Sequence, residues 1–116
     1  MAIRAAIYAR FSTDKQSDTS IQDQTRLCRT QAESLGFSIV SVHSDSAVSG
    51  STPVAERLGG RELLAAALAR RFDVLMVEGL DRLSRDQVEQ ESVVRRLEHR
   101  GLRIVGVADG YDSAAG

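Results

Sequence analysis

Short apolar segments alternate with segments of helical periodicity along the chain, and this alternation constrains the fold more than any other feature. The apolar segments, each expected to form a strand, are residues 3–9, 37–43, 73–77 and 102–107. The segments between them have apolar residues three and four positions apart, which predicts helices over residues 21–35, 61–71 and 87–100. Strands that alternate with helices form parallel sheets. The sequence therefore predicts an α/β domain with a mostly parallel central sheet of about four to five strands, flanked by helices.

The first predicted helix has recognisable ends and one apolar face. Ser20 is a typical N-cap with Asp23 three residues later, and Gly36 is a typical residue just beyond a helix C-terminus. The residues expected to face inward are Ile21, Thr25, Cys28, Ala32 and Leu35. Cys28 is therefore interpreted as a packing residue.

Composition limits the classes of protein to which the chain can belong. Its 116 residues suffice for one domain with a core and are too few for two. The single cysteine excludes an internal disulfide framework and a Cys-based zinc site. We expect a soluble, cytoplasmic protein without a membrane partner, since no signal peptide or membrane-length apolar stretch occurs. The net charge of −1 indicates that any affinity for duplex DNA is not supplied by an overall positive charge.

Ligands of parallel sheets bind outside the carboxyl ends of the strands, so the loops at that edge matter most. These loops are predicted at residues 11–19, 44–60 and 79–86. The middle loop has 17 residues, is rich in Ser and Gly, and is expected to be long and mobile. His43 and His99 lie outside any motif and are expected at the surface.

The three loops contain one candidate nucleophile, Ser12, together with several arginines. The arginines are Arg10, Arg57, Arg82 and Arg85. A hydroxyl among guanidinium groups suits attack on a phosphodiester, because guanidinium forks match the oxygens on which negative charge develops. Asp81 would orient one of the arginines. Taken alone, each motif also fits ordinary loop chemistry or a solvated helix start.

Two sequence motifs resemble the signatures of one enzyme family. Residues 8–16, Tyr-Ala-Arg-Phe-Ser-Thr-Asp-Lys-Gln, resemble the N-terminal signature of the resolvase/invertase family of serine recombinases. Residues 80–86, Leu-Asp-Arg-Leu-Ser-Arg-Asp, resemble its second signature, and residues 45–57 resemble its mobile catalytic loop. The residues of the first motif are most similar to those of the large-serine integrase and transposase branch of this family. The resemblance implies a resolvase catalytic domain over residues 1–116, with the C-terminal dimerisation helix and DNA-binding region absent.

The resemblance also implies a reaction and a set of site residues. In site-specific DNA recombination, Ser12 would attack a DNA phosphodiester to give a 5′-phosphoserine, after which strands are exchanged and rejoined. The residues implied around the scissile phosphate are Arg10, Arg82 and Arg85, with Asp81 in support and Arg57 as the arginine of the catalytic loop. The residues implied to support the site or bind substrate are Gln16, Gln24, Asp45 and Tyr8. No metal or cofactor is implied, because the bond energy is conserved. The implied partners are double-stranded DNA and, in the full-length protein, further copies in a homodimer or homotetramer.

Two other classes of function fit the same fold. A metal-dependent phosphotransferase or phosphatase would use Asp45, Asp81 and Asp86 as oxygen ligands. A receiver-like signalling module would need acidic residues after the first strand, where Asp14 is late and alone.

Overall fold

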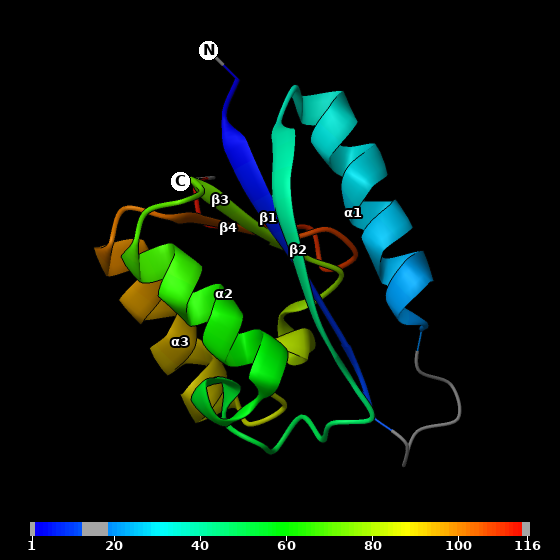
Figure 1. The fold of residues 1–116 in the computed structure, drawn as a ribbon, viewed down its shortest axis with the longest axis vertical. Helices are drawn as coiled ribbons and strands as arrows, with labels where there is room; N and C mark the ends of the chain where they lie inside the picture. The colour runs from blue at the N-terminus through cyan, green and yellow to red at the C-terminus, as the bar shows by residue number, and fades with distance from the viewer. Residues whose placement is uncertain (1, 13–18, 115–116) are drawn as a thin grey trace.

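The computed structural model describes residues 2–12 and 19–114 and contains one five-stranded sheet with helices on both faces (Figure 1). The strands are β1 (Arg4–Phe11), β2 (Ser38–Ser46), β3 (Val74–Val77), β4 (Arg103–Gly106) and β5 (Tyr111–Asp112). The α-helices are α1 (Ile21–Leu35), α2 (Leu58–Leu68) and α3 (Gln87–His99), and the 3-10 helices are η1 (Val54–Glu56) and η2 (Leu80–Arg82). Helix α1 lies on one side of the sheet, and α2 and α3 lie on the other (Figure 1). The predicted fold class is confirmed.

The order of the strands explains where a site can form. The sheet runs β2-β1-β3-β4-β5, with β5 antiparallel and the other neighbours parallel. The chain leaves β1 toward α1 on one face and leaves β3 toward α3 on the opposite face (Figure 1). Such a reversal between adjacent parallel strands opens a crevice at their carboxyl ends. The loops after β1 and β3 therefore start side by side.

Two apolar clusters, one on each face of the sheet, form the core. Alternate residues of β1 point into the two clusters. Ala6 and Tyr8 belong to the cluster beneath α2 and α3, and Ala5 and Ile7 belong to the cluster beneath α1. Cys28 packs in the second cluster as predicted, and burial raises the pKa of its thiol to about 12.

The ends of α1 follow the sequence signals. The Ser20 side chain accepts a hydrogen bond from the backbone N–H of Asp23 at 3.1 Å, and Gly36 adopts a φ of 76° beyond the last turn. Leu35, predicted to face inward, is 40% exposed, because it lies in the last turn of the helix.

The predicted 17-residue loop is wrong at both ends. Strand β2 continues to Ser46 and α2 begins at Leu58, so residues 59 and 60 are helical. The reason is the Asp45 carboxylate, which accepts hydrogen bonds from the backbone N–H groups of Gly59 and Gly60 and so caps the helix. At its other end α2 stops at Leu68, short of the predicted 71.

The structure also corrects the placement of His43. This side chain is buried at 8% exposure beneath α2, where its ring nitrogens lie 3.1 Å from Glu62 Oε1 and 2.9 Å from Ser41 Oγ. The expectation that it lies at the surface is wrong, because the alternation of β2 turns residues 43 and 45 toward α2. The short strand β5 was also not predicted.

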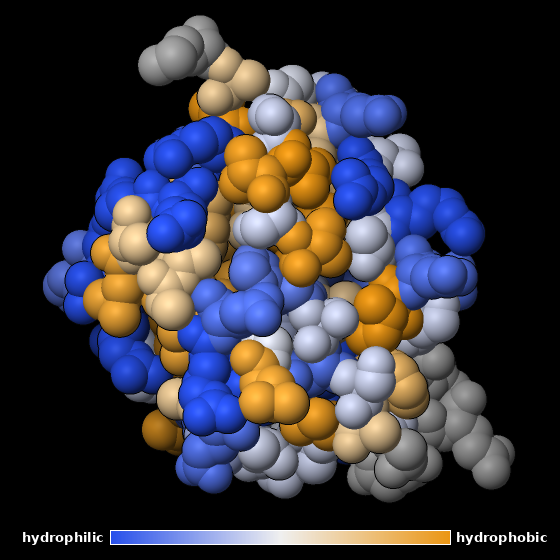
Figure 2. Space-filling model, viewed as in Figure 1, coloured by the Kyte–Doolittle hydropathy of each residue, from blue (hydrophilic) through white to orange (hydrophobic). Residues whose placement is uncertain are grey.

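The remaining surface carries an apolar strip along the outer edge of the sheet. Hydrophobic side chains gather over β2 between α1 and α2 (Figure 2), where Val40 is 46% and Val42 is 39% exposed. Within the described residues, no helix has the length and apolar character needed to cross a membrane.

Candidate active site

Ser12 directly follows β1 and lies at the carboxyl edge of the sheet, with an exposed fraction of 2%. The stretch of residues 44–60, here called the middle segment, meets Ser12 from one side, since Arg10 is paired with Asp45 in the register of β1 and β2. The stretch of residues 79–86, here called the third segment, meets Ser12 from the other side, through hydrogen bonds between Arg10 and the backbone of η2. The three segments predicted from the sequence therefore come together around the end of β1.

Arg10 is fully buried and its guanidinium group bonds to backbone carbonyls of two other segments. Nε donates to the carbonyl of Arg82 at 3.2 Å, Nη1 to that of Val48 at 2.9 Å and Nη2 to that of Asp81 at 3.0 Å. Burial, followed by the nearby positive charges of Arg57 and Arg82, lowers the pKa of Arg10. The side chain thus ties the middle and third segments to the strand that precedes Ser12.

Arg57, at 2% exposure, is held in a similar way. Its Nε donates to the carbonyl of Thr52 at 2.9 Å, and its Nη2 donates to that of Leu83 at 2.8 Å. Its Nη1 donates to the Tyr8 hydroxyl at 3.0 Å and to the Arg82 carbonyl at 2.9 Å. The structure therefore places the predicted catalytic-loop arginine in the cluster, where it joins the middle segment to the third.

Arg82 is held by β1 and by the residue that directly follows β3. Its Nη1 donates to the carbonyl of Arg10 at 2.9 Å, and its Nη2 donates to Glu78 Oε1 at 2.8 Å. Asp81, the predicted partner, is farther away, with its Oδ1 3.9 Å from Arg82 Nε and its side chain 55% exposed. Sequence reasoning missed Glu78, although its position four residues before an arginine was a usable signal.

Arg85 is only partly buried and lies beyond the end of η2, which stops at Arg82. A spacing of three residues would place Arg82 and Arg85 on one side of a helical turn, but the two arginines do not share such a turn. The backbone N–H of Arg85 donates to the carbonyl of Gly50 at 3.2 Å. A Cβ atom at Gly50 would lie 2.6 Å from Arg85 Cγ, so the absence of a side chain at residue 50 lets Arg85 lie against the middle segment.

Gln24, one of the predicted supporting residues, holds the backbone around Ser12. Gln24 accepts from the N–H of Arg10 at 3.1 Å and donates to the carbonyls of Arg10 and Thr19, each at 2.9 Å. It thereby fixes the end of β1 against the start of α1. Gln16, the other glutamine, lies outside the described residues.

Tyr8 and Asp45 form a buried pair beneath the arginines. The Tyr8 hydroxyl donates to Asp45 Oδ2 at 2.7 Å, and burial is the main cause of a raised pKa for this tyrosine. Asp45 is also the cap of α2, so one carboxylate connects the helix, the sheet and, through Tyr8, the guanidinium group of Arg57.

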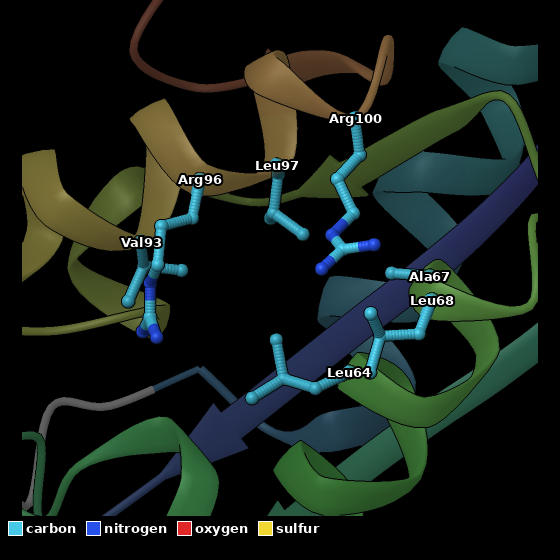
Figure 3. Close-up of a pocket in the computed structure, with 7 residues that line it drawn as sticks. All are labelled: Leu64, Ala67, Leu68, Val93, Arg96, Leu97 and Arg100. Atoms are coloured by element: carbon cyan, nitrogen blue, oxygen red, sulfur yellow. The ribbon is translucent and has the colours of Figure 1, made fainter.

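A separate cavity of about 150 Å³ lies between the C-terminal halves of α2 and α3 (Figure 3). It is lined by Leu64, Ala67, Leu68, Val93, Arg96, Leu97 and Arg100. None of these residues belongs to the three segments around Ser12, so the cavity is not part of the candidate site.

The ligand set required by the metal-dependent alternative does not form. Among residues 2–12 and 19–114, no group of three or more His, Cys, Asp and Glu side chains is arranged to hold a metal ion. Asp45 instead accepts hydrogen bonds from Tyr8 and the start of α2.

The fold and the site together define a class: an α/β domain with a buried serine and a cluster of arginines at the carboxyl edge of a parallel sheet. Residues 5–116 match the family described as Resolvase, N terminal domain. The chain belongs to the resolvase family and is a serine recombinase catalytic domain.

Solved structures of similar proteins agree with this assignment. The N-terminal catalytic domain of TP901-1 integrase is 25% identical, with a TM-score of 0.87 over 97% of this chain and 83% of that chain. The C-terminal catalytic domain of ISC1926 TnpA, an IS607-like serine recombinase, is 31% identical, with a TM-score of 0.74 over 88% of this chain and 68% of that chain. A resolvase family site-specific recombinase from Streptococcus pneumoniae is 21% identical and shares the fold, with a TM-score of 0.77 over 98% of this chain and 78% of that chain. No curated protein sequence gives a significant match. These matches do not favour the phosphotransferase or receiver alternatives.

Proposed function

We propose that Ser12 is the nucleophile with which this serine recombinase cuts and rejoins DNA in site-specific recombination. The observation that carries the proposal is the 2.9 Å hydrogen bond from Arg82 Nη1 to the carbonyl of Arg10. It joins the second signature motif to the first, two residues before Ser12, so a serine hydroxyl and arginines meet at one edge of the sheet.

The proposed chemistry conserves bond energy. The Ser12 oxygen forms a bond to phosphorus while the bond from phosphorus to the 3′ oxygen breaks, which leaves a 5′-phosphoserine and a free 3′-hydroxyl. The serine proton is lost and the departing 3′ oxygen gains one. Attack by a 3′-hydroxyl on the phosphoserine reverses the step and rejoins the strand, without a metal or an energy-supplying cofactor.

The arginines divide between support and charge stabilisation in this proposal. Arg10 and Arg57 are buried and bonded to the backbone, so they hold the segments in place around the phosphate. Arg82 and Arg85 stabilise the negative charge that develops on the phosphate oxygens. The proposed supporting residues are Asp81, Asp45, Tyr8, Gln24 and, by resemblance, Gln16.

The proposed partners are double-stranded DNA and further copies of the protein. Exchange of strands between two duplexes needs several nucleophiles, so we expect a homodimer or homotetramer of the whole protein. Residues 1–116 form its catalytic domain, and the resemblance assigns dimerisation and site recognition to other regions. The net charge of −1 supports this division, because the domain has no overall positive charge with which to bind duplex DNA.

Trapping of covalent complexes tests the proposal. The whole protein is incubated with a duplex library of random sequence in excess EDTA, and DNA that remains protein-bound after denaturation is recovered and sequenced. We expect 5′-linked adducts that enrich one site, and Ser12→Ala should abolish them. Cleavage that requires added magnesium and leaves no adduct would refute the proposal, and an adduct that persists in Ser12→Ala would move the nucleophile to another residue.

A further inference from the structure

Glu78 closes a ring of hydrogen bonds that joins Arg82 to the residues on both sides of the segment carrying Ser12. Glu78 Oε1 accepts from Arg82 Nη2 at 2.8 Å and from Thr19 Oγ1 at 3.2 Å. Arg82 Nη1 donates to the carbonyl of Arg10, and Gln24 Nε2 donates to the carbonyls of Arg10 and Thr19, each at 2.9 Å. We refer to these five residues, Thr19, Glu78, Arg82, Arg10 and Gln24, as the Glu78 ring.

We propose that Glu78 is a positioning residue that sets the guanidinium group of Arg82 relative to Ser12. The inference rests on the proposed function and adds a residue to it. Arg10 precedes Ser12 by two residues, and Thr19 immediately precedes the cap of α1. The ring therefore fixes the chain before and after the nucleophile to the same arginine.

The burial of the ring makes it rigid. Arg10 and Gln24 are fully buried, and the side chains of Arg82 and Glu78 are 7% and 16% exposed. A charge-assisted hydrogen bond in such surroundings is stronger and more directional than one in water. Both Thr19 and Arg82 donate to the same oxygen of Glu78, so a displacement of either group disturbs the other.

The charge of Glu78 argues for positioning rather than for direct catalysis. A carboxylate beside the phosphate would repel it, and Glu78 partly neutralises an arginine that the proposed reaction uses. Its benefit is geometric: with Nη1 bonded to β1 and Nη2 bonded to the residue that follows β3, the guanidinium plane of Arg82 has one orientation. A small misplacement of such a group slows a reaction strongly.

The rate constant for Ser12 adduct formation at saturating DNA tests the inference. We expect Glu78→Gln, in the whole protein on the recovered site, to lower this rate constant by about 10- to 100-fold, with DNA affinity changed by less than about twofold. Thr19→Val keeps the shape and the charge of the ring but removes one donor, and should lower the rate constant by about threefold to tenfold. Glu78→Gln and Thr19→Val weaken the same set of hydrogen bonds, so the double variant should lose less than the product of the two single losses.

Two matched substitutions serve as controls. Glu62→Gln removes an exposed carboxylate bonded to His43, and Thr30→Val removes a hydroxyl bonded to the carbonyl of Arg26 within α1. Both lie outside the ring and should leave the rate constant within about twofold of the wild type.

The outcomes separate the inference from the function on which it rests. If the wild type forms no Ser12 adduct, the proposed function fails. If the wild type forms the adduct and Glu78→Gln forms it at the same rate constant, positioning by Glu78 is refuted. A fall only in the amount of active protein, with an unchanged rate constant, also refutes it, since that is the mark of a purely structural residue. If Glu78→Gln does not fold, Thr19→Val decides, and a wild-type rate constant there overturns the inference.

Discussion

Replacing Asp45 by asparagine should destabilise the domain strongly, although the two side chains have nearly the same shape. The Asp45 carboxylate accepts from the Tyr8 hydroxyl at 2.7 Å and from the N–H groups of Gly59 and Gly60 at 2.8 and 2.9 Å. In asparagine one of the two oxygens becomes an NH₂ group, which must then face at least one of these donors.

The magnitude follows from those contacts. A charge-assisted hydrogen bond contributes about 1.5–3 kcal/mol, and a negative charge at a helix N-terminus adds about 0.3–2 kcal/mol. Asp45 is 6% exposed, so solvent does not replace what is lost. We expect Asp45→Asn to lower the free energy of unfolding by about 3 kcal/mol, which for a domain of this size lowers the melting temperature by about 12 °C.

Thermal and urea unfolding followed by circular dichroism measure the effect. Asp86→Asn is the matched control, because Asp86 caps α3 through one bond to the N–H of Val88 at an exposed position. Asparagine is as good an N-cap as aspartate, so this change should stay within about 0.5 kcal/mol. A loss of less than about 1 kcal/mol in Asp45→Asn would refute the view that its charge holds the start of α2.

Three further predictions concern other parts of the molecule. In the whole protein, Arg82→Lys and Arg85→Lys should each lose most of the DNA cleavage while the fold and DNA binding persist, because lysine lacks the planar fork; near-normal cleavage in gel assays would make both arginines structural. Cys28, whose buried thiol has its pKa raised to about 12, should not react with a thiol reagent at pH 8 until the chain is unfolded in urea, and rapid labelling of the native chain would contradict its burial. The hydrogen bond from Arg103 lowers the pKa of Asp112, so this pair stabilises the fold above the carboxyl pKa of the unfolded chain, about 3.9. Its contribution is lost as the pH falls through the lower pKa of the folded state. In Asp112→Asn, the free energy of unfolding measured in urea should therefore fall less steeply between about pH 5 and about pH 2, and an unchanged slope would exclude this pair as the cause of the fall.

The sequence predicted the sheet and α1 well, because their signals are local. Residues 5–9 of β1 and all of β3 are buried, and Ser20 and Gly36 end α1 as such residues usually do. The three site segments followed from one general rule, that the carboxyl ends of parallel strands meet at one edge.

The errors arose where a distant contact overrides a local preference. Gly59 and Gly60 indicated a loop, but a Cβ at Gly59 would lie 2.2 Å from the Ser44 carbonyl oxygen and one at Gly60 would lie 2.1 Å from that of Val54. These glycines are helical because α2 begins against the backbone of β2 and η1, and Asp45 supplies the cap. No local pattern contains that information.

The segments of the candidate site were predicted from the sequence, but the contacts between their side chains were not. Asp81 was selected as the partner of an arginine because it is adjacent in sequence, whereas the closer carboxylate is Glu78, directly after β3. The burial of Arg10 and Arg57 was not predicted either, because arginine is rarely buried and the carbonyl groups that receive its hydrogen bonds belong to segments far away in sequence.

The choice of carbonyl partners for Arg10 and Arg57 has an electrostatic consequence. A carbonyl group accepts a hydrogen bond from the guanidinium group without neutralising its charge, whereas a carboxylate would accept the hydrogen bond and also neutralise the charge. Within the described contacts, the guanidinium groups of Arg10 and Arg57 therefore bond to no carboxylate directly, and positive charge gathers at this edge of a domain whose net charge is −1. The mutual repulsion of these guanidinium groups works against folding and is relieved when an anion arrives. A bound phosphodiester would supply negative charge beside these arginines, and the folded domain should be sensitive to the anions of its buffer in a way that its overall charge would not suggest.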